Sequence, residues 1–333
     1  MKDIQYNSAN VRIRTYESQL LDQAFFDRLL NVEQASELYN ILQETPYGDF
    51  IDESLTKHDF EKVLMAEQKR TFDLAYEMTP LKAVVDIFTL RYDYQNLKVL
   101  VKNAYLQEDL EAYVVPLGSI DLAVLKEFVQ VRHHALVPQI MVDCLTEVYA
   151  YIEDYKEIQG IDIIFDSYYW QHFLEVTQAT NQSEFIELSQ RLVDVYNLSV
   201  VLRSYLMGRK KGFMSAVLVE GGLLTKETLL AYLETSFEAL LDYLVETDYG
   251  PLIMSTIDEL QEHKTINQFD LLKDNFLMRY FKERKVIPFG PIPLLGYLNA
   301  KESEIKNLRM IFVGKINRIP TEKLRSRVRE TYG

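Results

Sequence analysis

The sequence lacks the short motifs that mark most nucleotide-binding and hydrolytic proteins. No GxxxxGK[ST] phosphate loop, GxGxxG turn, HExxH helix or CxxC pair occurs in its 333 residues. The five histidines are scattered, and the adjacent His133 and His134 would point about 100° apart on a helix instead of sharing a metal ion. We therefore predict no catalytic residue, no metal site and no bound cofactor.

Cysteine, glycine and proline are also scarce. The single cysteine, Cys144, excludes an intrachain disulfide, and its surroundings PQIMVDCLTEVY indicate a buried thiol on a helix. A chain without disulfides suits the cytoplasm, which is the expected compartment. Twelve glycines and nine prolines are about 6% of the chain, where roughly 12% is usual, so long helices are favoured over a turn-rich β fold. We predict an all-α protein.

Long apolar runs are absent as well. No stretch approaches the ~18 uninterrupted apolar residues of a membrane-spanning helix. The first residues, MKDIQYNSANVRIR, lack the apolar core of a signal peptide. We expect no bilayer span, so that any contact with a membrane is made through a partner.

Charge is distributed unevenly. The formal net charge of −14 argues against nucleic-acid binding, because phosphate repels an acidic surface. Residues 301–333 nevertheless hold nine basic and four acidic residues, a net charge of +5, against −19 for the remainder. Either this basic end binds a different partner from the acidic body, or its cations only complement helix C-termini.

Three helical stretches carry the same Asn-Leu pair. They are Asn96-Leu97 in YDYQNLKVLVKNAYL, Asn197-Leu198 in LVDVYNLSVVLRSYL and Asn307-Leu308 in KESEIKNLRMIFVG, separated by 101 and 110 residues. Apolar residues three, four and eight places after each leucine form one stripe along a helix. The recurrence predicts one helical unit used three times.

Two further segments recur at similar distances. The helix-breaking ETPYG at residues 44–48 matches ETDYG at 246–250, and a middle copy near Tyr149 keeps only the tyrosine. VVPLGSIDLAVLKEF at 114–128 resembles LVEGGLLTKETLLAY at 218–232. RIPTEKLRSRV at 318–328 is a weaker third copy, in which Ile319 and Leu324 keep the five-residue step of Ile120 and Leu125. Boundaries near 113 and 218 follow. The predicted domains are residues 1–113, 114–218 and 219–333, packed directly because no Pro-, Ser- or Gly-rich linker separates them.

The three asparagines need a physical reason, because Asn is a mediocre helix former. Its recurrence beside an apolar stripe suggests a side-chain hydrogen bond to a neighbouring helix end or loop. Such a group left buried without a partner would cost ~1–3 kcal/mol. We therefore interpret Asn96, Asn197 and Asn307 as structural residues and not as catalytic ones.

Two other classes of protein remain open. Asp162 and Asp166 lie four apart in GIDIIFDSYY and could share Mg²⁺ and a diphosphate in a helical enzyme, although no second acidic motif accompanies them. A helical scaffold protein without an active site is the other. Its repeat of roughly 100 residues would exceed the ~33–47 of TPR, HEAT and ankyrin arrays.

The third repeat resembles a known family. GPIPLLGYLNAKESEIKNLRMIFVGKINRIP is similar to the C-terminal signature of a V-type ATPase component that is named C in prokaryotic enzymes and d in eukaryotes. The matching elements are Pro293, Tyr297, Lys301-Glu302, Glu304, Asn307-Leu308-Arg309, Gly314-Lys315 and Pro320. Arg12, Arg14, the ETxYG breaks and the VxxGG segment at 219–222 also suit that family, so the resemblance covers nearly the full length.

The resemblance implies an architecture and a role. Three similar helical domains would form a funnel around a pseudo-threefold axis with a central hollow. The hollow would receive the foot of the central stalk, made of the D and F components, and the funnel would sit on the cytoplasmic face of the proteolipid (c/K) ring. The chain would be a rotor part without an active site.

Basic residues are the candidates for contacts with such partners. They lie in the first helix and in the basic C-terminal segment, and in the third repeat Arg309 and Lys315 replace Ser199 and Tyr205 of the second. The predicted partner-contact residues are Arg12, Arg14, Arg309, Lys315, Arg318, Lys323, Arg325, Arg327 and Arg329.

Overall fold

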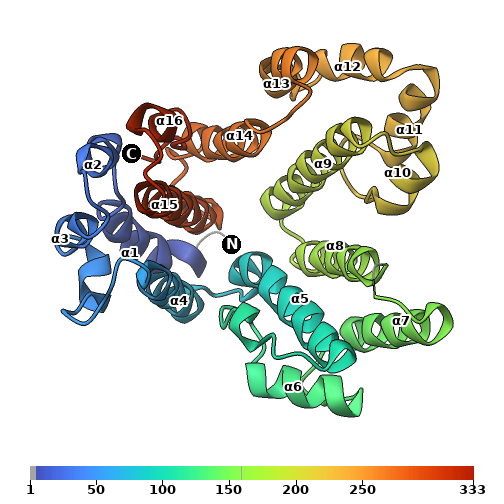
Figure 1. Cartoon of the computed structure of the whole chain (residues 1–333), viewed down its shortest axis with the longest axis horizontal. Coiled ribbons are helices and arrows are strands. Elements are labelled where there is room, and N and C mark those ends of the chain that lie inside the picture. Colours follow the sequence, from blue (N-terminus) through green and yellow to red (C-terminus); the bar gives the residue numbers. More distant parts are fainter. Residues whose placement is uncertain (1–4, 159) are drawn as a thin grey trace. The chain divides into compact units, whose positions relative to one another are not determined.

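The computed structural model describes residues 5–158 and 160–333, apart from the side chains of residues 261 and 263. Over this part of the chain it contains sixteen α-helices, short 3₁₀ turns and no strand (Figure 1). The predicted all-α class is therefore confirmed. No helix in the described residues is both long and apolar enough to cross a membrane.

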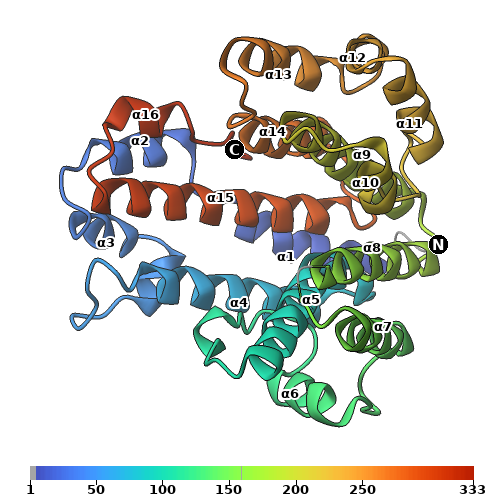
Figure 2. The same cartoon turned by 45° about the vertical axis from the view of Figure 1, so that its right-hand side comes forward.

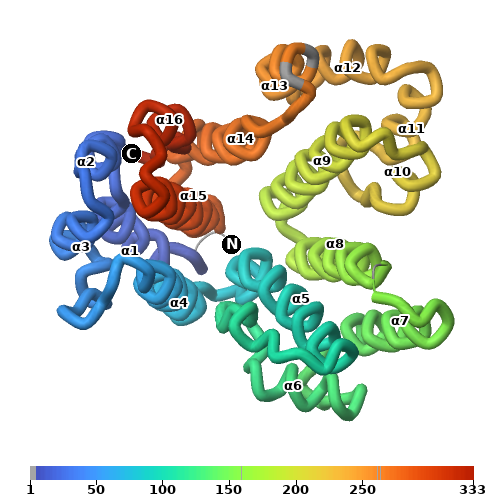
Figure 3. Tube along the Cα trace, in the orientation of Figure 1, coloured from blue at the N-terminus to red at the C-terminus, as the bar shows by residue number. Residues whose placement is uncertain are grey.

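The chain divides into two compact units. Unit 1 combines Met1–Val85 with Pro251–Gly333, and unit 2 is the continuous segment Asp86–Gly250. Both ends of the chain therefore belong to unit 1, and the trace in Figure 3 shows the blue N-terminal helices beside the red C-terminal ones. The three-part division drawn from the sequence repeats stays a prediction.

Unit 1 is built from helices of both chain ends. They are α1 (Asn7–Glu17), α2 (Gln23–Asn31), α3 (Glu37–Leu42), the 3₁₀ helix η2 (Pro46–Phe50), α4 (Phe60–Met78), α13 (Gly250–His263), which opens at the boundary, α14 (Phe269–Glu283), α15 (Ile292–Ile316) and α16 (Thr321–Arg325).

Unit 2 holds the helices between them. They are α5 (Ala83–Leu106), which begins in unit 1, η3 (Glu111–Tyr113), α6 (Leu122–Val131), α7 (Gln139–Tyr155), α8 (Ile161–Ala179), α9 (Ser183–Leu206), α10 (Lys211–Val217), α11 (Lys226–Thr235) and α12 (Phe237–Val245). Asp121 and Thr225 cap α6 and α11 by accepting backbone N–H groups.

The core of unit 1 surrounds α15. This helix contacts α1, α2, α4, α14 and α16, and Figure 2 shows it with α2 and α16 on one side and α1 and α4 on the other. Because neighbours cover it all round, its buried residues do not follow a single stripe. Phe312 stacks on Phe60 with 5.0 Å between ring centroids. Leu308, like Leu97 and Leu198 in the other two copies, is fully buried.

The two ETxYG breaks have the same geometry. Thr45 Oγ1 donates to the Leu42 carbonyl at 2.6 Å, and Thr247 Oγ1 donates to the Leu244 carbonyl at 2.6 Å. The glycine after each tyrosine is required by space. A Cβ on Gly250 would lie 2.2 Å from the Val245 carbonyl oxygen, so the turn closes only without a side chain.

The middle copy of this motif is not a break. At the position of the glycine it has Ala150, and α7 runs straight through it from Gln139 to Tyr155. Tyr149 consequently stays on the helix surface, where its hydroxyl donates to the Val129 carbonyl at 3.2 Å. Either the second unit has drifted here or the alignment with Tyr149 is wrong, and in both cases residues 145–150 form no break.

The close approach at Gly250 generates a prediction. Gly250→Ala should lower the free energy of unfolding by about 1–3 kcal/mol, because the new methyl group meets rigid backbone. Urea unfolding of the full chain measures this. Gly212→Ala is the matched control, since a Cβ there has nothing within 4 Å, and it should leave stability unchanged or slightly higher. Equal stability of the two variants would contradict the steric explanation.

Candidate functional site

Each of the three asparagines binds one residue of the chain that follows its helix. Asn96 Nδ2 donates to the Val115 carbonyl and its Oδ1 accepts the Val115 N–H, both at 2.8 Å. Asn197 does the same with Val219, at 2.8 and 2.9 Å. We call this pair of hydrogen bonds the asparagine clasp. It confirms the predicted side-chain hydrogen bond to a neighbouring loop.

The third clasp corrects the sequence alignment. Asn307 exchanges hydrogen bonds with Arg329, whose carbonyl accepts at 3.1 Å and whose N–H donates at 2.8 Å. The partner thus lies 22 residues after the asparagine, as in the second copy. The segment 318–328, which the sequence aligned with 114–128, is not the equivalent, because that alignment places Gly314 and not Arg329 opposite Val115. Its apolar residues Ile319 and Leu324 matched the pattern by spacing alone.

A buried carboxylate lies three residues before each asparagine. Asp93 accepts the N–H groups of Ser119 and Ile120, both at 3.0 Å. Asp194 accepts the N–H groups of Leu223 and Leu224, at 3.1 and 2.9 Å. Each carboxylate therefore fixes the loop a few residues beyond the clasp.

These carboxylates explain the glycine that the two loops share. A Cβ on Gly118 would lie 2.0 Å from Asp93 Oδ1, and a Cβ on Gly222 would lie 2.1 Å from Asp194 Oδ1. Sequence reasoning noticed both glycines but missed both aspartates. The signal was available, because an acidic residue precedes all three asparagines by three places.

The third carboxylate, Glu304, is one methylene longer and reaches different partners. Its Oε2 accepts the Leu21 N–H at 2.6 Å, and its Oε1 accepts the Tyr47 hydroxyl at 2.7 Å. In the second copy Tyr249 likewise donates to Asp194, at 2.6 Å. The tyrosine of the ETxYG break thus closes onto the carboxylate in two copies.

A cation lies one helical turn before the carboxylate in the same two copies. Lys301 Nζ lies 2.7 Å from Glu304 Oε1 and 3.2 Å from Glu67 Oε1, and all three side chains are buried. Burial alone lowers the pKa of Lys301, but Glu304, Tyr297 and Glu67 hold it above its usual range. Arg191 takes the equivalent place in the second copy, and Leu90 in the first.

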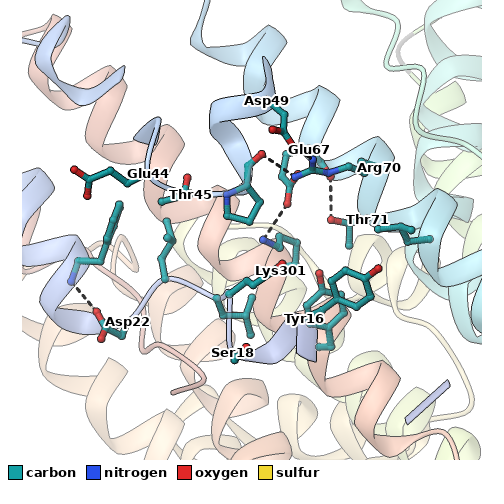
Figure 4. Close-up of a pocket in the computed structure, with 17 residues that line it drawn as sticks. Tyr16, Ser18, Asp22, Glu44, Thr45, Asp49, Glu67, Arg70, Thr71 and Lys301 are labelled. Atoms are coloured by element: carbon teal, nitrogen blue, oxygen red, sulfur yellow. Dashed lines mark hydrogen bonds and ion pairs between the residues drawn. The ribbon is translucent and has the colours of Figure 1, made fainter. Parts of the chain in front are cut away.

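This ionic cluster forms one wall of a cavity of about 820 Å³ in unit 1. The cavity lies between the α1–α2 connection, the first break, α4 and α15, and Figure 4 shows Lys301 and Arg70 pointing toward Glu67. Arg70 pairs with Glu67 and with Asp49, the latter at 2.5 Å. The cations and carboxylates of this cavity wall pair with one another. The wall is therefore suited to holding helices together and not to acid–base chemistry.

The aspartates of the enzyme alternative are occupied by lysines. Asp162 accepts both its hydrogen bonds from Lys102 Nζ, each at 2.9 Å, and Asp166 pairs with Lys98. The two pairs tie α5 to α8. Within the described residues no group of three His, Cys, Asp or Glu side chains could hold a metal ion.

Most of the predicted partner-contact residues have contacts within the chain. Arg309 makes two hydrogen bonds to Glu61, at 2.6 and 3.0 Å, and Lys315 donates to the Leu30 carbonyl at 2.6 Å. The remaining pairs are Arg12 with Glu77, Arg14 with Glu17, Arg325 with Asp27 and Arg329 with Asp274. Apart from the Arg14–Glu17 pair, which lies within α1, these contacts join different segments of unit 1.

Arg318, Lys323 and Arg327 differ from the rest of the basic segment. Their side chains are exposed, and no ion pair or hydrogen bond of these side chains is found in the described residues. They are the cations of this segment that remain available for another molecule.

Comparison with known proteins identifies the family. The fold is that of a helical chain in which one Asn-Leu helix recurs three times, each time with its own clasp. The chain belongs to the family described as ATP synthase (C/AC39) subunit, whose model matches residues 9–327. It is thus a C-type component of the V-type and A-type rotary ATPases.

Individual relatives agree over nearly the whole length. The C subunit of the V-type sodium ATPase of Enterococcus hirae is 32% identical over 329 residues, which is 99% of each chain. The C subunit of the A-type ATP synthase of Methanocaldococcus jannaschii is 28% identical over 342 residues, covering 96% of this chain and 85% of the relative. The corresponding protein of Thermococcus kodakarensis is 26% identical over 325 residues, covering 91% and 85%.

Removing one clasp tests its structural role. Asn197→Ala should lower the free energy of unfolding by about 1–3 kcal/mol, because it leaves the Val219 N–H and carbonyl without their partner. Asn317→Ala removes an exposed amide that donates to the Val313 carbonyl, and it should change stability by less than ~0.5 kcal/mol. Urea unfolding compares the two. A clasp variant as stable as its control would refute the assignment.

Asp93 gives a pH dependence. Burial raises its pKa to about 6, although Ser119 and Ile120 donate to it. The folded chain therefore binds this proton more tightly than the unfolded chain, whose Asp pKa is ~3.9. The resulting stability is complete below pH ~4 and is lost as pH rises through ~6, on the order of 2–3 kcal/mol.

Asp93→Asn removes that proton equilibrium. Between pH 4 and 7 the free energy of unfolding should fall less steeply for the variant than for the wild type. Urea unfolding at several pH values measures both slopes. Parallel curves would show that Asp93 does not titrate in this window.

Proposed function

We propose that this chain is a non-catalytic rotor protein that couples the central stalk of a rotary ATPase to its membrane ring. Membership of the C/AC39 family over residues 9–327 supports its place in the complex. The partners would be the D and F proteins of the stalk and the proteolipid c/K ring. The chain would lie on the cytoplasmic face of the membrane, peripheral to it through the ring.

The observation that carries the mechanical part is the threefold asparagine clasp. Three equivalent joints, at Asn96, Asn197 and Asn307, support three equivalent helical units arranged as a funnel around a hollow. An adaptor that transmits torque must keep its helices from slipping past one another. The clasps and the buried Lys301 pairs oppose such sliding, because they fix a loop or helix at one register.

The available cations of the C-terminal segment are the proposed polar contacts to a partner. Arg318, Lys323 and Arg327 are exposed on a chain that is acidic elsewhere. Rim charges of this kind contribute mainly to association rate and specificity, and their effect weakens with salt.

Reconstitution tests the proposal. The full chain, mixed with purified D/F stalk and with detergent-solubilised proteolipid ring, should bind both and restore ATP-driven ion transport to a complex lacking it. Asp162→Ala/Asp166→Ala should assemble normally, since it removes only partly exposed ion pairs. A chain that binds neither stalk nor ring is not a rotor adaptor.

Charge reversal tests the polar contacts. Arg318→Glu/Lys323→Glu/Arg327→Glu should weaken binding to one partner by roughly tenfold at low salt and by less at high salt. The control Lys57→Glu/Lys82→Glu/Lys210→Glu changes the net charge equally at other exposed sites. The same loss in both variants would indicate a general charge effect and no local contact.

A further inference from the structure

The connection that leads into the Asn-Leu helix differs in one of the three copies. It is TPLK (79–82) before α5 and TNQ (180–182) before α9. Before α15 it is RKVIPFGP (284–291), which is twice as long as the longer of the other two. We call this segment the apolar loop.

Large apolar side chains of this loop face solvent. Val286 is 86% exposed, Phe289 56% and Ile287 39%, whereas the two short connections expose no large apolar side chain. A single exposed apolar residue is ordinary, but three within four positions are typical of a binding surface. Exposed apolar side chains do not contribute to the hydrophobic core, so the stability of the fold does not explain them.

Helix α1 holds the backbone of the apolar loop in place. Asn10 Nδ2 donates to the carbonyls of Pro288 and Gly290, both at 3.0 Å. Arg14 donates to the carbonyls of Lys285 and Ile287, at 2.9 and 3.4 Å. The loop is therefore ordered before anything binds, which reduces the entropy cost of using it as a contact.

The surroundings indicate the chemistry of the partner. Val11, 72% exposed, lies one turn before Arg14 on α1 and adds to the apolar surface. Arg284 and Lys285 open the loop and Lys282 lies just before it, against the single exposed carboxylate of Glu283 in this stretch. A complementary partner would offer apolar side chains edged by Asp and Glu.

We propose that the apolar loop and Val11 are the docking surface for the foot of the central stalk. This inference rests on the proposed function. A ring of many identical subunits presents nearly the same surface in every direction about its axis, so it gives little reason to specialise one copy. The stalk is a single object without that symmetry. A loop that is lengthened in only one of the three copies is suited to such a partner.

The test uses two double variants of the full chain. Val286→Ser/Phe289→Ser removes the apolar surface, and Val131→Ser/Leu136→Ser removes two apolar side chains of similar exposure, 59% and 71%, at the α6–α7 turn of unit 2. Both should fold like the wild type, because the altered side chains are exposed. Binding is measured separately to purified D/F stalk, to proteolipid ring, and to vesicles of equal phosphatidylglycerol and phosphatidylethanolamine.

The loop variant should bind the stalk at least ~30-fold more weakly while its ring binding stays unchanged, and the control should match the wild type. If the loop variant binds the stalk as tightly as the wild type, the loop is not the docking surface, and the proposed function is unaffected. Loss of ring or vesicle binding in place of stalk binding assigns the loop to another partner. A wild type that binds neither stalk nor ring overturns both.

Discussion

The side-chain amide of asparagine has an NH2 group that donates and an oxygen that accepts. It can therefore bind both the carbonyl and the N–H of one backbone residue. Asn96, Asn197 and Asn307 use this match to hold the segment that follows each long helix. Asp in the same place would lack the donor, and Gln would place the amide one methylene further out. The register of each loop depends on this one amide. In the first two copies the carboxylate and glycine beside the clasp depend on it as well.

The three copies have diverged around that shared joint. The second and third add a tyrosine and a cation to the carboxylate, whereas the first has Leu90 at the position of the cation. Among the described residues Asp93 has no ion pair, and burial raises its pKa to about 6. The three copies of the repeat thus differ in which groups compensate the charge of the buried carboxylate.

The sequence was sufficient to predict the helices, the recurrent asparagines and the bonding role of those side chains, because helical periodicity and residue type are local properties. It was insufficient for the buried cluster of Lys301, Glu67 and Glu304. Charged residues on a helix usually indicate an exposed face, and only the fold shows that α4 and α15 enclose them. The partner of Asn307 was also missed, since Arg329 shares no side-chain feature with Val115 or Val219.

Unit 1 has its two halves at opposite ends of the chain. Glu304 binds Leu21 and Tyr47, which are 283 and 257 residues away in sequence. During synthesis the first 85 residues therefore leave the ribosome long before α15 exists to cover them. Unit 2, which is continuous, can fold while they wait. Completion of unit 1 falls to the last helices made, so a prematurely terminated chain leaves the apolar faces of its N-terminal helices open to chaperones and proteases.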